Sequence, residues 1–142
     1  MKLQREVTTS APPDRVFAYL SDFTTTTEWD PGTVKTVRVT GDGGVGTTYD
    51  NTSKFMGRET QLTYEVVELE SPRRIVLHGA NKTVDATDSI TVEANGAGSR
   101  VTYSADFDFK GAAKLFAPFL APALKKLGDE AEEGLRTALA RL

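Results

Sequence analysis

The chain changes its hydrophobic period between residues 98–110, which read GSRVTYSADFDFK, and residues 111–142, which read GAAKLFAPFLAPALKKLGDEAEEGLRTALARL. In the first segment apolar and polar residues alternate, as in a β-strand with one buried face. In the second, apolar residues recur every three or four positions among strong helix formers, which predicts one long C-terminal helix. Pro118 and Pro122 fall early in it and predict a bent or late-starting first section. The apolar stripe comprises Phe116, Leu120, Leu124, Leu127, Ala131, Leu135, Ala138 and Leu142.

Residues 1–32 predict one strand followed by two short helical segments. Leu3–Thr9 is the strand, and Ser10–Asp14 is a helix start in which a hydroxyl residue precedes two prolines that the first turn tolerates. The apolar positions of this helix are Val16, Phe17, Leu20 and Phe23. Thr24–Thr27 suits a connector or a second helical turn, and Trp29–Gly32 is a turn.

Between Thr33 and Lys110 the period is two, which predicts six further antiparallel strands. The segments that separate these strands are Gly41–Gly44, Met56–Gly57, Ser71–Pro72, Gly79–Thr83 and Asn95–Gly98. The apolar phase shifts by one residue between Val66 and Val67, which predicts a β-bulge.

Composition excludes several classes of protein. The 142 residues suffice for one domain, residues 1–142, and the net charge of -3 gives no reason to expect nucleic acid as a partner. The absence of cysteine and the single histidine exclude disulfides, thiolate sites and paired imidazoles. No metal-ligand spacing or phosphate loop occurs, so we expect no metal and no cofactor. Without an apolar run long enough for a membrane span or a signal peptide, we expect a cytoplasmic protein with no integral membrane association.

Four segments resemble a known family: VTTSAPPDRVF (residues 7–17), WDP (residues 29–31), VVELESPRRI (residues 66–75) and GSRVTY (residues 98–103). They are similar to the SRPBCC superfamily, which includes START lipid-transfer domains, polyketide cyclases and the birch pollen allergen, and within it to the polyketide cyclase/dehydrase and lipid-transport branch. The resemblance implies an α+β helix-grip fold, in which a seven-stranded antiparallel sheet wraps around the long C-terminal helix and two short helices lie between strands 1 and 2. These motifs specify the fold but carry no catalytic group, so the function has to be argued from the site.

The resemblance also implies an apolar cavity between the sheet and the helix. The residues support this independently, because one helix cannot cover seven strands and several inward positions are small or polar. Examples are Asn51, Ser53, Ala86 and Ala105. The alternative is a tightly wrapped sheet filled with large side chains. The residues expected to bind a ligand in such a cavity are Tyr49, Asn51, Ser53, Phe55, Tyr64, Asp88, Phe107, Phe116, Leu120 and Leu124.

Asp88 is the clearest anomaly, because it is a carboxylate on the apolar face of its strand. Either it anchors a ligand or transfers protons inside the cavity, or it lies at a strand end and reaches solvent or a backbone amide. It is the candidate catalytic residue. Tyr103 is expected in the core, Trp29 as a structural plug, and His78 on the surface.

Apolar residues at the predicted turns suggest a gate at the cavity mouth, where the resembled fold brings three turns together. Its members would be Phe55, Met56, Phe116 and Phe119, and the alternative is simple packing of the hairpin tip on the start of the helix.

Three functions are compatible with these features. The first is binding, with transport or sequestration, of a hydrophobic small molecule such as a lipid, polyketide or aromatic metabolite. The second is a polyketide aromatase/cyclase or dehydratase, with Asp88 or a tyrosine transferring protons without metal or nucleotide cofactor. The third is an interaction protein that presents its surface to a protein partner. The sequence does not identify the ligand.

Overall fold

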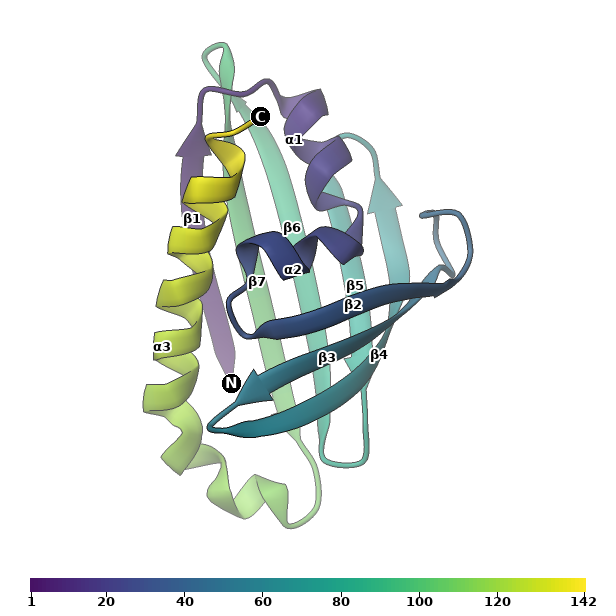
Figure 1. Ribbon diagram of the computed structural model, residues 1–142, viewed down its shortest axis with the longest axis vertical. Coiled ribbons are helices and arrows are strands. Elements are labelled where there is room, and N and C mark those ends of the chain that lie inside the picture. The colour runs from purple at the N-terminus through teal and green to yellow at the C-terminus, as the bar shows by residue number, and fades with distance from the viewer.

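A computed structural model describes residues 1–142 as one curved sheet with a long helix beside it (Figure 1). The strands are β1 (Lys2–Thr9), β2 (Thr33–Thr40), β3 (Thr48–Phe55), β4 (Arg58–Glu70), β5 (Arg74–Ala80), β6 (Val84–Asn95) and β7 (Gly98–Phe109). The helical segments are α1 (Pro13–Leu20), the 3-10 helix η1 (Phe23–Thr25), α2 (Thr26–Trp29) and α3 (Ala113–Leu139).

All seven strands are antiparallel to their neighbours, in the order β1-β7-β6-β5-β4-β3-β2. The sheet is strongly bent, so that β2, β3 and β4 cross over β5, β6 and β7 in Figure 1. Short helices α1 and α2 lie between β1 and β2 in the chain; α1 packs against β6 and β7, and α2 packs against β2 and α3. The predicted helix-grip fold, with seven strands, two short helices after the first strand and a long C-terminal helix, is confirmed.

The register of the sheet confirms the predicted bulge and shows where alternation does not determine burial. The pairing of β4 with β5 shifts between Val66 and Glu68, which leaves Val67 as the extra residue. On edge strand β2, Val37 and Val39 are exposed, whereas Thr36 is buried. The Thr36 side chain lies 2.7 Å from the hydroxyl of Thr26, since α2 covers this part of the strand.

Helix α3 has two sections with different surroundings. Figure 1 shows its first section, which contains Pro118 and Pro122, bent relative to the rest, as predicted. The later section buries Leu135 and Leu139 in the main core, whereas Leu115 and Phe119 near its start are 74% and 78% exposed. None of the helices combines the length and the hydrophobicity needed to cross a lipid bilayer. Because Leu115 and Phe119 are exposed, the start of α3 stands away from the sheet and leaves room beneath it.

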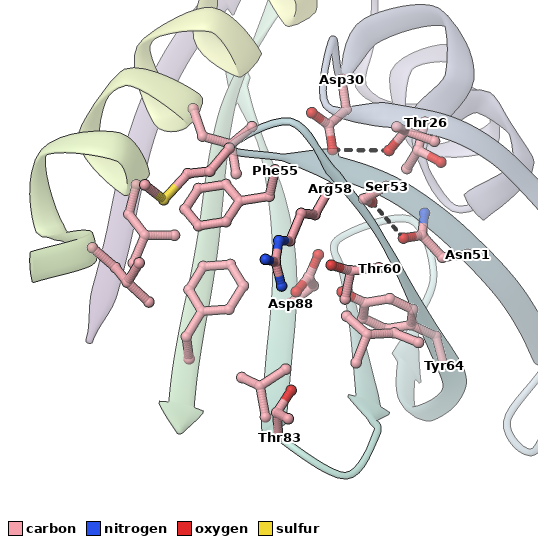
Figure 2. A pocket seen from close by; sticks show the side chains of 18 of the residues that line it. Thr26, Asp30, Asn51, Ser53, Phe55, Arg58, Thr60, Tyr64, Thr83 and Asp88 are labelled. Carbon is pink, nitrogen blue, oxygen red and sulfur yellow. Dashed lines mark hydrogen bonds between the residues drawn. The ribbon is translucent and has the colours of Figure 1, made fainter. Parts of the chain in front are cut away.

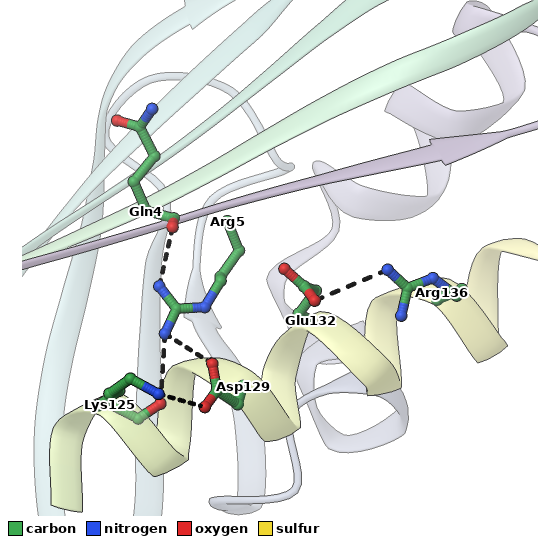
Figure 3. Close-up of polar contacts among 6 residues, drawn as sticks. All are labelled: Gln4, Arg5, Lys125, Asp129, Glu132 and Arg136. Atoms are coloured by element: carbon green, nitrogen blue, oxygen red, sulfur yellow. Dashed lines mark hydrogen bonds and ion pairs between the residues drawn. The ribbon is translucent and has the colours of Figure 1, made fainter. Parts of the chain in front are cut away.

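Two contacts hold the later section of α3 in place. Gly134 lies directly against the carbonyl group of Trp29, where a Cβ atom would overlap the backbone. On the other side, Arg5 of β1 donates hydrogen bonds to Asp129 Oδ1 (2.9 Å) and to the Lys125 carbonyl (3.3 Å), as Figure 3 shows. The hydrogen bonds from Lys125 and Arg5 lower the pKa of Asp129. Helix α3 is thus fixed to both β1 and α2.

Candidate functional site

A cavity of about 530 Å³ lies between the sheet and the first half of α3. Of its 24 lining residues, 15 are hydrophobic. The lining as a whole comes from η1, α2, β2, β3, β4, β6, β7 and α3 and from the turns between them. Ligand pockets in proteins commonly have volumes of roughly 300–1,000 Å³ with mostly apolar walls and a few polar groups. The interior of the wrapped sheet is therefore hollow, and the alternative of a filled interior is wrong.

Small residues occupy inward positions of the central strands, as the alternation predicts. Ala86 and Ala105 are buried, and Ala105 lies opposite Asp88 in the pairing of β6 with β7. Neither alanine lines the cavity itself.

Nine of the ten residues predicted to bind a ligand line this cavity. They are Asn51, Ser53, Phe55, Tyr64, Asp88, Phe107, Phe116, Leu120 and Leu124. Tyr49, the tenth, does not line the cavity. Its side chain is on the inward face of β3, but its ring packs against Phe23 of η1, with a centroid distance of 5.7 Å, in the part of the sheet that η1 covers.

Residues from the three turns expected at the cavity mouth line the cavity. They are Phe55 and Met56 from the β3–β4 hairpin, Thr83 from the β5–β6 turn and Phe116 from α3. Phe119, the fourth residue of the expected gate, does not line the cavity and is 78% exposed.

Asp88 lies in the middle of β6 and points into the cavity (Figure 2). It is 5% exposed, which excludes the alternative of a strand-end residue that reaches solvent. Its Oδ2 accepts a hydrogen bond of 3.2 Å from the Tyr103 hydroxyl, and its Oδ1 has no hydrogen-bond partner. Burial raises the pKa of Asp88 from 3.8 to about 7, with a smaller lowering by the Tyr103 hydrogen bond and a further increase from the charge of Asp30. Asp88 can therefore hold or release a proton near neutral pH.

A second polar group lies along β3, where the side chains satisfy one another. Ser53 donates to Asn51 Oδ1 (2.7 Å, Figure 2), and Asn51 donates in turn to the Thr36 hydroxyl (2.9 Å). Asn51 and Ser53 are therefore hydrogen-bond partners of each other, while both residues still face the cavity.

Sequence reasoning missed Asp30 and the indole nitrogen of Trp29. Asp30 follows α2 and accepts hydrogen bonds from the Gly32 backbone N–H and the Thr33 hydroxyl, both 3.0 Å long. Trp29 is 1% exposed, as its predicted role as a plug requires, but it also lines the cavity and its Nε1 has no partner. Both residues lie in a segment whose sequence predicts an ordinary turn. The only indication of a role in the site was a Trp-Asp pair directly before Pro-Gly.

The remaining titratable side chains include His78, which lies away from the cavity, and Arg58, which lines it. The side chain of His78 is 47% exposed, and its Nε2 lies 4.0 Å from Asp85 Oδ1 on the outer face of the sheet, as predicted. No group of three or more His, Cys, Asp or Glu side chains is placed to hold a metal ion. Arg58 lines the cavity, and Figure 2 shows it extending from the hairpin strand β4.

Sequence comparison agrees with this architecture. The family described as "Polyketide cyclase / dehydrase and lipid transport" matches residues 1–140. The chain belongs to this family. A comparison with curated proteins finds no match.

Solved structures with the same fold have diverged far in sequence. The Zhui aromatase/cyclase from Streptomyces sp. R1128 superimposes with a TM-score of 0.83 at 15% identity, over 98% of this chain and 93% of that one. A START superfamily protein from Mycobacterium smegmatis gives 0.77 at 10% identity, over 97% and 96%. Ara h 8.0201 gives 0.63 at 18% identity, over 96% and 98%. At these identities the similarity establishes the fold of this family member, and its ligand has to be inferred from its own residues.

Proposed function

We propose that this protein binds a hydrophobic small molecule, for transport or sequestration, in the cavity between the sheet and α3. The observation that carries the proposal is a hollow of about 530 Å³ whose lining is mostly hydrophobic and which opens beside exposed apolar residues. Burial of apolar ligand surface supplies the driving force, at about 25 cal/mol per Å². A ligand of about 20 non-hydrogen atoms, at about 0.3 kcal/mol per atom, would bind with a Kd of tens of micromolar.

The test uses a variant that fills the cavity and a matched control on the same helix. Leu120 lines the cavity, whereas Leu115 is exposed and does not. Leu120→Trp is expected to displace the compounds that native mass spectrometry finds with the purified wild-type protein, and Leu115→Trp is expected to retain them. A wild-type protein that is reproducibly empty and binds no apolar probe would argue against the proposal.

A second candidate function is a polyketide aromatase/cyclase or dehydratase. It is favoured by one specific observation, the buried carboxyl of Asp88, whose pKa of about 7 suits proton transfer at neutral pH. The aromatase/cyclase among the similar structures supports this only through the shared fold. Asp88→Asn is expected to abolish turnover of an identified substrate while retaining its binding. Turnover that survives this change would remove Asp88 from the mechanism.

The proposed place of action is the cytoplasm, as expected from the sequence. Fractionation of cells that produce the protein at natural levels tests this, because a protein recovered with the membrane or outside the cell would contradict it.

A further inference from the structure

Two buried side-chain atoms lack any hydrogen-bond partner, and both belong to residues that line the cavity. They are Trp29 Nε1 and Asp88 Oδ1. The two residues are 1% and 5% exposed. Because buried polar groups in proteins are nearly always paired, an unpaired one costs stability and indicates a missing partner. Two such atoms in one cavity point to a ligand that supplies the partner.

Tyr103 places these two atoms in one region of the cavity. Its ring meets the Trp29 indole edge to face, with a centroid distance of 5.3 Å, and its hydroxyl donates to Asp88 Oδ2 at 3.2 Å. The Tyr103 hydroxyl is therefore occupied, and Asn51 and Ser53 are engaged with each other. The buried side-chain atoms that lack a partner on the Tyr103 side of the cavity are Trp29 Nε1 and Asp88 Oδ1.

The protonation of Asp88 determines what this capacity can bind. Since Oδ2 accepts the hydrogen bond from Tyr103, the proton of the neutral carboxyl lies on Oδ1, where it points to no protein atom. An indole N–H can only donate. When Asp88 is neutral, Trp29 Nε1 and Asp88 Oδ1 thus offer two unpaired donors in this part of the cavity, and Asp30 nearby opposes the entry of an anion.

We propose that Trp29 and Asp88 form an oxygen anchor that selects apolar ligands with a neutral carbonyl group at their inner end, against hydrocarbons and against carboxylates. A carbonyl oxygen accepts hydrogen bonds without donating, which complements the two donors. This inference rests on the proposed binding function, and it excludes free fatty acids from the ligands that the cavity prefers.

The anchor depends on pH because ionised Asp88 no longer donates. The other titratable or charged groups that surround it are Tyr103 on β7, Tyr64 on β4, Asp30 after α2 and Arg58 at the start of β4. Burial raises the pKa values of both tyrosines well above 10, so they remain neutral. With a pKa of about 7, the neutral fraction of Asp88 falls about tenfold between pH 6 and pH 8, and apparent affinity for a carbonyl ligand falls with it.

The experiment compares three naphthalenes of similar size by equilibrium dialysis: 2-acetylnaphthalene, its hydrocarbon isostere 2-isopropenylnaphthalene, and 2-naphthoate. At pH 6 the wild-type protein is expected to bind the ketone about tenfold more tightly than the isostere, since the isostere leaves both donors unpaired. The ratio of the two affinities is expected to fall about fivefold at pH 8, because a ketone bound beside ionised Asp88 keeps only the apolar contacts that the isostere also makes. The carboxylate is expected to bind most weakly at both pH values.

Variants separate the anchor from general effects on the cavity. Asp88→Asn keeps a donor, so the preference for the ketone should persist and lose its pH dependence, whereas Asp88→Leu should reduce the preference. Trp29→Phe should reduce the preference and keep the pH dependence. Asp85→Asn, on the outer face of the same strand, is the matched control and should behave as wild type.

The possible failures are distinguishable. If the ketone and its isostere bind equally well, or if the carboxylate binds best, the anchor is refuted while the binding function stands. If Asp88→Asn retains the wild-type pH dependence, the assignment to Asp88 is refuted. If none of the three probes binds to the folded protein, the binding function itself is contradicted.

Discussion

Replacement of Asp88 by asparagine should change how stability depends on pH. In the unfolded chain the carboxyl has its ordinary pKa of 3.8, and in the folded protein burial raises the pKa to about 7. Below pH 3.8 the group is neutral in both states. As pH rises further, the unfolded state ionises first, so the wild-type protein loses stability until the folded state ionises as well, near pH 7.

The magnitude follows from the same two values. The two pKa values differ by about 3, which at about 1.36 kcal/mol per pH unit corresponds to about 4 kcal/mol of stability lost between pH 4 and pH 8. Asparagine cannot ionise, so the free energy of unfolding of Asp88→Asn should increase by this amount relative to that of wild type between pH 4 and pH 8. Any effect of the substitution that does not depend on pH adds the same value at every pH.

Urea unfolding of both proteins at intervals from pH 4 to pH 8 measures this difference. Other titrating groups, Asp30 included, are present in both proteins and largely cancel. Asp106→Asn on the exposed side of β7 serves as the control and should show no comparable trend. A free-energy difference between wild type and Asp88→Asn that is constant with pH, or that favours wild type as pH rises, would show that Asp88 is not a buried acid with a raised pKa.

Three further predictions concern single contacts. Gly134→Ala should lower stability by about 1–3 kcal/mol in urea unfolding, because the added Cβ overlaps the Trp29 carbonyl, and exposed Thr137→Ala should not. Phe116→Ser should weaken binding of 2-isopropenylnaphthalene about fivefold, because it removes an apolar side chain from the cavity wall. Phe119→Ser should leave the Kd unchanged, and equal effects of the two substitutions on the Kd would contradict this prediction. Tyr103→Phe should raise the pKa of Asp88 further, observable by carboxyl NMR titration, since the lost hydrogen bond lowers it; a decrease would show that another group controls this carboxyl.

The strands and helices follow from local pattern because each side chain's face depends on the period of its own segment. The alternation along residues 101–110 and the shift at Val67 identified β7 and the bulge of β4 without any knowledge of their neighbours. The same parity identified Asp88 as an inward carboxylate. Nine of the predicted ligand residues therefore line the cavity.

The alternation of side chains did not predict which inward residues line the cavity, because this depends on the helices that pack over the sheet. Tyr49 and Asn51 share the inward face of β3, but η1 covers the first, and the cavity lies over the second. Phe116 and Phe119 belong to the same turn of α3, and only the bend and the position of that helix direct the first toward the cavity. Pro118 and Pro122 predict the bend, but neither the cover by η1 nor the direction of the bend follows from the periodicity of a single segment.

Local sequence was sufficient for the order of elements, the inward faces of the strands and the anomalous position of Asp88, because these depend on interactions among residues a few positions apart. The convergence of Trp29, Tyr103 and Asp88 joins segments up to 74 residues apart along the chain, and the cavity joins segments from Phe23 to Leu127, which are 104 residues apart. Whether a buried donor or acceptor is satisfied depends on every group that packs around it. The unpaired atoms of Trp29 and Asp88 are therefore visible only after the sheet has folded over α3.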